Sequence, residues 1–357
     1  MSGPPSPPSG WVSPPDQGWG TTDPQGWYPP PAQGWAPPPP APKPGVIPLR
    51  PLGVGDVLEA TLATLRRYPA ATLGSSLLVV AVVSTLQLVL LWPVISALAD
   101  LPEPVVDQQG LDAWWQALES FPWQWALVAG VLAGMLSFLL LTSLTGLLAV
   151  VVGQAVLGRT LSFGQAWRRA APRLPRLLVT VLLVALAVSA IWLVLAGLAL
   201  VAVAASAPTV VAALLLLAAL AALPASLWLG VRLALASPAV MLESQDGRAI
   251  GPAAAVRRSW RLVGGAWWRT FGVVLLGSVI AGALSGLVSA PVQALVAAAP
   301  LSLGAGLVLT TLGAVVGQAV SLPISGLVLA LVYVDRRIRA EGLDTALAHA
   351  AGVAGPQ

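Results

Sequence analysis

The sequence predicts an all-α, polytopic membrane protein. Six transmembrane helices are expected, as three repeats of an interfacial amphipathic helix plus a transmembrane hairpin, behind a disordered N-terminal arm. The 357 residues are 57% hydrophobic and only 9% charged, whereas soluble domains carry about 25% charged residues. Six apolar stretches exceed the roughly 20 residues that cross a bilayer. The basic residues lie almost entirely on one side of these stretches.

The first 45 residues form the predicted arm. They contain 16 Pro and 7 Gly residues, a composition that cannot build a hydrophobic core. Trp11, Trp19, Trp27 and Trp35 recur in this arm every eight residues, each after a Gly. The period favours either a multivalent polyproline II ligand for a cytoplasmic protein or a solvated spacer that grew by repeat slippage. The apolar stretch typical of a signal peptide is missing from the arm.

Residues 46–345 form the predicted membrane domain, and residues 346–357 form a short C-terminal tail. The predicted spans are 71–99, 124–156, 177–204, 208–241, 270–298 and 303–334. Short turns that contain Pro, at 206–208 and 299–301, separate the third span from the fourth and the fifth from the sixth. Because short connections make neighbouring helices antiparallel, these spans are predicted to form helical hairpins.

The distribution of charge predicts the orientation of the membrane domain. Seventeen of the 18 Lys and Arg residues precede the first span, follow the sixth, or lie between the second and third or the fourth and fifth. The long loop on the opposite side, 100–123, carries acidic residues instead. By the positive-inside rule, we expect a multi-pass protein of the bacterial inner (plasma) membrane with both termini in the cytoplasm.

An internal repeat links two of the basic loops. An ungapped shift of 89 residues sets Arg168-Arg169 on Arg257-Arg258, and residues 161–165 resemble residues 52–56. Each of these segments precedes a hairpin. The pattern predicts parallel repeats about an axis along the membrane normal.

Local signals mark where the helices before the hairpins begin. Ser162 with Gln165 is typical of a capping box. Gly251-Pro252 is typical of an N-cap followed by Pro at the first helical position. Asp56 suits the first turn of a helix, where the helix dipole favours a negative charge.

The third of these helices is predicted to lie in the membrane interface. Val256, Trp260, Val263 and Trp267 follow one another at i, i+4, i+7 and i+11, with basic residues on the other faces. That spacing indicates an amphipathic helix.

A six-residue motif occurs twice. Val151–Val156 and Val315–Val320 are identical, and each contains a Gln, Gln154 or Gln318, next to a Gly. A Gln in a transmembrane helix can hydrogen-bond to a neighbouring helix, which contributes about 0.6 kcal/mol on average. The motif predicts helix packing, with a polar lining shared by two repeats as the alternative.

Arg232 is the basic residue that falls within a predicted span. A charge at membrane depth is by default a functional candidate, but a long side chain near the end of a span can also snorkel to the headgroups. Glu243 is the candidate partner for an ion pair. Because eleven residues of straight helix separate the two by about 16 Å, pairing would require a bend, which Pro238 could supply.

Three segments carry a resemblance to a known family: Ile47–Gly53, Arg257–Val263 and Tyr333–Asp344. They resemble recurring segments of actinobacterial six-helix membrane proteins of undefined role. Those proteins are similar to the membrane domain fused to some glycerophosphoryl diester phosphodiesterases. The likeness covers about residues 46–345. In that family the phosphodiesterase activity belongs to a separate barrel domain with His and Glu residues. This sequence has neither that domain nor the histidines, so the resemblance implies a membrane domain whose role it does not define.

The last of these segments also predicts local structure. Asp335 with Arg339, and Arg337 with Glu341, are spaced for i, i+4 ion pairs on a helix that leaves the membrane. Gly342 is placed to end that helix.

The residue inventory excludes several kinds of chemistry. The chain has no Cys and one His, His349, which excludes disulfides, thiolate nucleophiles and His clusters for zinc. We expect no enzyme activity, no cofactor and no nucleic-acid partner. The favoured hypothesis is an envelope scaffold or accessory protein whose Arg-rich inner face contacts anionic lipid while the arm recruits a cytoplasmic protein. The alternative is a transporter of small molecules or lipids.

The candidate functional residues follow from these hypotheses. The expected headgroup contacts are Arg168, Arg169, Arg257, Arg258, Arg336 and Arg337, and the expected buried polar positions are Gln154, Gln318 and Arg232.

Overall fold

The computed structural model describes residues 45–48, 50–99, 112–113, 116–117, 119–159, 162–205, 209–245, 248–343 and 345. The chain divides into two units, Met1–Pro40 and Ala41–Gln357, and all of the described residues belong to the second. The predicted arm up to residue 44, the predicted turn at 206–208 and the predicted tail lie outside the described residues.

Helices make up most of the described chain. In order, the elements are α1 (Val54–Arg67), the π-helix η1 (Ala70–Gly74), α2 (Ser75–Ala99), α4 (Trp123–Val156), α5 (Phe163–Ala170), the 3-10 helix η2 (Ala171–Arg173), α6 (Leu174–Ala204), α7 (Thr209–Leu233), α8 (Ala236–Leu242), β1 (Ser244–Gln245), β2 (Arg248–Ala249), α9 (Pro252–Gly264), α10 (Trp267–Ala298) and α11 (Leu303–Glu341). The short strands β1 and β2 pair antiparallel, with Gln245 opposite Arg248. The predicted all-α class is confirmed.

Six helical stretches in the described residues are long and apolar enough to cross a membrane. They are 70–97, 123–156, 163–202, 209–242, 267–298 and 304–341, which confirms the six predicted spans. The third stretch begins 14 residues earlier than predicted (163 against 177) because α5, η2 and α6 follow one another without a break. The protein thus has the helices of a multi-pass membrane protein.

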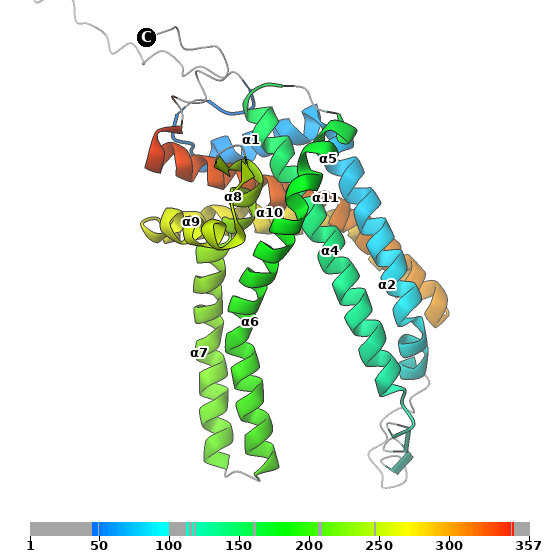
Figure 1. Cartoon of the computed structure of the whole chain (residues 1–357). Helices are drawn as coiled ribbons and strands as arrows, with labels where there is room; N and C mark the ends of the chain where they lie inside the picture. Colours follow the sequence, from blue (N-terminus) through cyan, green and yellow to red (C-terminus); the bar gives the residue numbers. More distant parts are fainter. Residues whose placement is uncertain are drawn as a thin grey trace, which may run out of the picture. The chain divides into compact units, whose positions relative to one another are not determined.

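The long helices pack as consecutive pairs. Helix α2 lies beside α4, α6 beside α7, and α10 beside α11 (Figure 1). The turn between α10 and α11 is tight, because the Ala299 N–H still donates to Leu295 and the Leu301 N–H donates to the Ala299 carbonyl. Helix α11 also contacts α1, α2 and α4, whereas α6 and α7 are joined to the other elements mainly through α8 and α9.

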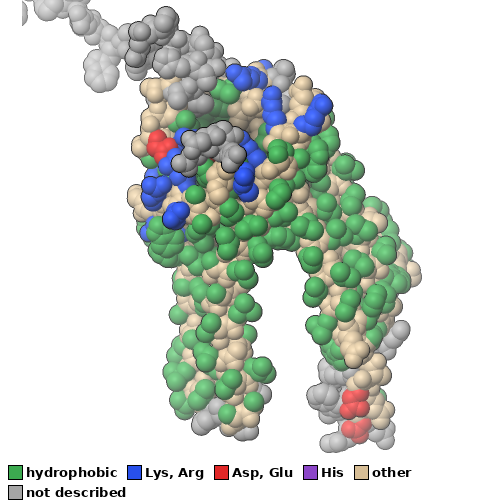
Figure 2. Space-filling view, viewed as in Figure 1, with side chains coloured by type: hydrophobic (Ala, Val, Ile, Leu, Met, Phe, Trp, Pro, Cys, Tyr) green, Lys and Arg blue, Asp and Glu red, His purple; other side chains and the backbone are tan. Residues whose placement is uncertain are grey.

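One end of the second unit holds the short helices and most of the described basic side chains. We call it the basic end; it comprises α1, α5, η2, α8, α9 and the adjoining ends of the long helices. Figure 2 shows Lys and Arg side chains gathered there with an acidic side chain among them, over a largely apolar surface, and further acidic side chains at the opposite tip. The charge asymmetry of the sequence is therefore an asymmetry in space.

The hydrophobic core also lies at the basic end. Its best-buried large side chains come from α4, α8, α11 and the segment before α1, among them Ile47, Leu52, Met241, Leu331 and Tyr333. Away from this end the helices expose apolar side chains, and Leu200 of α6 and Leu216 of α7 are 71% and 70% exposed. Lipid chains are as apolar as Leu, so such surfaces are expected where helices face a bilayer.

The predicted helix starts are confirmed. Ser162 and Gln165 form the capping box of α5, with hydrogen bonds of 3.4 and 3.2 Å. Gly251 is the N-cap of α9, with Pro at the next position. Asp56 lies in the first turn of α1, where its carboxylate accepts from the Gly53 N–H at 2.7 Å.

The predicted apolar stripe on α9 is only partly correct. Helix α9 ends at Gly264, so Trp267 belongs to the next helix and not to the stripe. The side chains of α9 that are buried in the protein are Ala255, Ser259, Leu262 and Val263, while Trp260 is 40% exposed. This buried face is the one that packs on α6, α7 and α8.

Candidate functional site

The segment before α1 is held by the end of α11 and the start of α10. The Leu52 N–H donates to the Asp335 carboxylate at 2.9 Å, and the Leu52 carbonyl accepts from Arg269 at 2.5 Å and Arg339 at 2.8 Å. Asp335 is 4% exposed, and Arg339 pairs with it at 2.9 Å, as the i, i+4 spacing predicted. Two of the segments that carry the family resemblance therefore meet at this point.

A second cluster joins α8, α9 and α11. The Glu243 carboxylate accepts from Arg258 at 2.9 Å, lies 3.4 Å from Arg337, and accepts the Tyr333 hydroxyl. Arg258 also pairs through two nitrogens with Glu341, which is bonded in turn to Arg337 at 2.9 Å. Burial alone would lower the pKa of Arg258, but its hydrogen bonds to Glu341 and Glu243 outweigh burial and raise that pKa.

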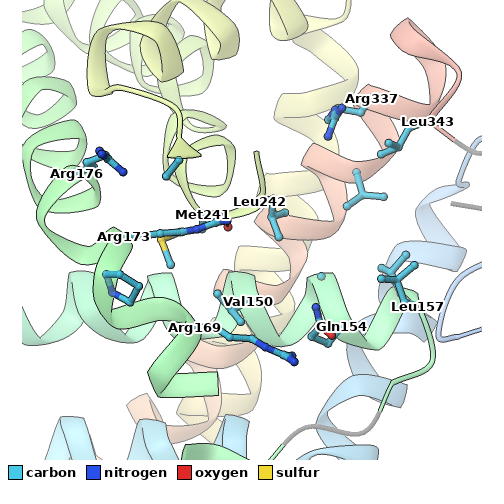
Figure 3. Close-up of a pocket in the computed structure, with 15 residues that line it drawn as sticks. Val150, Gln154, Leu157, Arg169, Arg173, Arg176, Met241, Leu242, Arg337 and Leu343 are labelled. Carbon is cyan, nitrogen blue, oxygen red and sulfur yellow. The ribbon is translucent and has the colours of Figure 1, made fainter. Parts of the chain in front are cut away.

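A cavity of about 710 Å³ lies beside this second cluster. Its walls come from the end of α4, from α5, η2 and the start of α6, from α8 and from the end of α11 (Figure 3). The polar side chains among its lining residues are Arg169, Arg173, Arg176, Arg337 and Gln154. The remaining lining is mainly apolar. Three of these five were candidate residues from the sequence, whereas Arg173 and Arg176 stand out in the sequence only as members of a basic loop between two spans.

These polar groups differ in how far protein partners already satisfy them. Arg337 is paired with carboxylates, and one nitrogen of Arg173 donates to the Met241 carbonyl. Arg169 and Arg176 make no side-chain hydrogen bond or ion pair with any described residue. Arg176 follows Arg173 by three positions where η2 runs into α6, a spacing that places two like charges side by side on a helix. The buried Oε1 of Gln154 likewise finds no partner in the described part of the protein.

Arg232 connects α7 to α9 through contacts of its side chain and of its backbone carbonyl. Its guanidinium stacks over Trp228 and Trp260, 5.0 and 4.5 Å from the ring centroids, and it donates to the Trp260 carbonyl at 3.1 Å. The hydroxyl of Ser259 donates to the Arg232 carbonyl at 2.7 Å. The partner expected from the sequence, Glu243, is bonded instead to the second cluster, because the chain turns at 234–235 and α8 then packs on α4, α6 and α9.

The other predicted site residues have separate locations. Arg168 and Arg257 are exposed. Arg336 donates to the Leu262 carbonyl at 2.9 Å. Gln318 is exposed on α11, so the two copies of the duplicated motif do not place their Gln residues in equivalent surroundings.

Comparison with known proteins identifies a family. The model of a domain of unknown function, DUF7847, matches residues 52–335. No curated protein and no solved structure matches the chain. The match begins at Leu52 and ends at Asp335, the two residues joined by the hydrogen bond described above. Because the match extends over more than half of its length, the chain belongs to the DUF7847 family.

Proposed function

We propose that the protein is a non-enzymatic scaffold or accessory protein of the bacterial inner membrane whose basic end binds anionic lipid headgroups. The observation that carries this proposal is the arginine-lined cavity, in which Arg169 and Arg176 have no protein partner among the described residues. Unpaired guanidinium groups at a membrane surface attract anionic lipids, at about 1 kcal/mol per basic residue.

The proposed orientation places the basic end on the cytoplasmic side, with both termini there. Cytoplasmic loops are the ones enriched in Lys and Arg, and the described basic side chains gather at one end (Figure 2). In this orientation α1, α5 and α9 would lie in the inner interface. Each of them precedes a pair of long helices, which supports the proposed three-fold repeat of interfacial helix plus hairpin.

Native lipid co-purification tests the headgroup proposal. Protein extracted from its own membrane should retain anionic lipids in a larger proportion than the bulk membrane contains, as measured by mass spectrometry. Retained lipids with the bulk composition would contradict the proposal.

We also propose that the N-terminal arm recruits a cytoplasmic protein. The described chain begins at Gly45, where an added Cβ would lie 2.2 Å from the Ala155 carbonyl oxygen, and Val46 donates to that carbonyl at 3.1 Å. The segment that follows the arm is therefore anchored to the end of α4. Deleting residues 1–40 should remove captured cytoplasmic proteins but leave membrane insertion unchanged. The same set of captured proteins from both forms would refute recruitment.

Transport of small molecules or lipids is the second candidate function. It is favoured by Gln154, which places an unsatisfied polar group beside a cavity at the end of a spanning helix. Changing Gln154 and Gln318 together to Leu should abolish flux if these residues line a path. If they serve only in packing, flux should persist and thermal stability should change.

We also propose that the chain is related to the membrane domain of glycerophosphoryl diester phosphodiesterases. If that domain shares this fold, its counterparts of Leu52 and Asp335 should occupy neighbouring positions, as these two residues do in the present chain. A structure of that domain in which they lie apart would refute the relationship.

A further inference from the structure

We propose that the cavity lined by Arg169, Arg173 and Arg176 is a specific site for a ligand with a terminal phosphate, and that it selects two negative charges over one. The proposal rests on the proposed headgroup binding and names the class of headgroup. The chemistry is shared by lipids that end in a phosphate and by soluble phosphate monoesters, so the experiment below separates these sources.

The polar groups of the cavity are suited to an anion. Four of the five polar side chains that line it are guanidinium groups, and no carboxylate is among the described lining residues. Guanidinium groups donate only, and their forked geometry matches phosphate oxygens. The fifth, Gln154, can add a neutral amide donor, because only its carbonyl oxygen is fully buried.

The balance of charge favours a dianion. Arg337 is already neutralised by Glu243 and Glu341, whereas the other three arginines have no carboxylate partner among the described residues. Arg173 and Arg176 are three positions apart where η2 runs into α6, a spacing that makes side chains neighbours on a helix and like charges unfavourable, and a bound anion would relieve that repulsion. A phosphate monoester carries about −1.5 to −2 charges at pH 7, and the diester group of an ordinary phospholipid carries only one.

The size and apolar lining of the cavity indicate more than a free ion. Its volume of about 710 Å³ falls in the range of about 300–1,000 Å³ that is typical of small-molecule sites. Val150, Met241, Leu242, Val334 and Leu343 supply apolar surface next to the guanidinium groups. A ligand that fills this space would combine a terminal phosphate with an apolar portion.

The structure offers matched variants for a test. Arg169→Gln with Arg176→Gln removes two charges from the cavity without breaking a contact to a described residue. Arg66→Gln with Arg261→Gln removes two charges from exposed positions of the basic end that are neither expected headgroup contacts nor lining residues of this cavity. Both pairs lower the net charge of the basic end equally, so long-range attraction to anionic lipid falls by the same amount.

The experiment compares two lipids in nanodiscs of phosphatidylcholine. One is phosphatidic acid, a monoester, and the other is phosphatidylethanol, a singly charged diester with the same acyl chains. Bound lipid is counted by native mass spectrometry. At pH 8 we expect the full-length protein to prefer phosphatidic acid by about tenfold, the effect of one additional charge-assisted hydrogen bond. The preference should shrink toward pH 5, because the second proton binds with a pKa of about 6.

The cavity pair of substitutions should abolish this preference, and the surface pair should retain it. Inorganic phosphate added at increasing concentration distinguishes the sources: displacement of phosphatidic acid indicates a site open to soluble phosphates, and resistance indicates a site for lipid. Either result is compatible with selection of the dianion.

Two results would overturn the proposal. One is equal binding of the two lipids by the unaltered protein at pH 8, which does not depend on the variants folding. The other is an equal loss of preference in both variant pairs. In either case anionic lipids would still be enriched over phosphatidylcholine if general headgroup binding is correct, whereas no enrichment of any anionic lipid would refute the proposed function itself.

Discussion

At the scale of single residues, the arginines of the basic end have separate roles. Arg258 and Arg337 are bound to Glu243 and Glu341, while Arg339 holds Asp335 and the Leu52 carbonyl. The sequence predicted the i, i+4 pairs because both partners of each pair are on one helix. It could not predict contacts such as Leu52 with Asp335, which are 283 positions apart, because no local pattern encodes them.

Asp335 is predicted to be the residue on which the attachment of the pre-α1 segment most depends. Asp335→Ala leaves the Leu52 N–H and two guanidinium groups without their buried acceptor. A buried N–H that loses its acceptor costs about 1–3 kcal/mol, and ion pairs to two arginines that are about a third exposed are lost as well, so the midpoint of thermal unfolding in detergent should fall.

Asp56→Ala is the control for this prediction. It also removes a carboxylate that pairs with Arg50 and accepts from the Gly53 N–H. That position is more exposed, and loss of a helix cap there costs about 1 kcal/mol. Equal effects of the two substitutions would show that Asp335 has no special role in stability.

At the scale of helices, the sequence predicts where a helix begins and ends, but it does not predict which other helices surround it. The Ser162–Gln165 capping box and the Gly342 end of α11, where φ is 65°, are local features and were predicted correctly. The identical motifs at Val151–Val156 and Val315–Val320 have different surroundings, because α4 ends against α5, α6 and α8 whereas this part of α11 packs on α10.

Replacing a glycine by alanine is predicted to change stability in opposite directions in α10 and α11. A Cβ added at Gly317 would lie 2.6 Å from the Ser285 hydroxyl and 3.1 Å from its carbonyl oxygen, whereas at Gly282 it would meet nothing within 4 Å. Ala is favoured over Gly in helices by about 1 kcal/mol. Gly282→Ala should therefore be neutral or stabilising, and Gly317→Ala destabilising, in thermal unfolding. A stabilising Gly317→Ala would mean that α10 and α11 do not approach so closely.

At the scale of the whole molecule, composition predicted most of the architecture. The six spans follow from apolar length, and the pairing of α6 with α7 and of α10 with α11 follows from short connections; both are present. Arg169, Arg173 and Arg176 are neighbours along the continuous run of α5, η2 and α6, but the cavity could not be predicted, because its other walls, from α4, α8 and α11, meet this run only in the folded chain. Because the cavity lies at the basic end, the ligands it can reach depend on which side of the membrane the basic end faces.

The most direct test of the central claim, a cytoplasmic basic end that binds anionic lipid, is therefore a topology measurement. A reporter enzyme that is active only outside the cytoplasm should be active when fused at Gln108, in the acidic loop between the first two spans, and inactive when fused at Gly355. An active reporter at Gly355 and an inactive one at Gln108 would place the basic end outside the cytoplasm. That result would contradict both the proposed lipid contacts and the proposed recruitment by the arm.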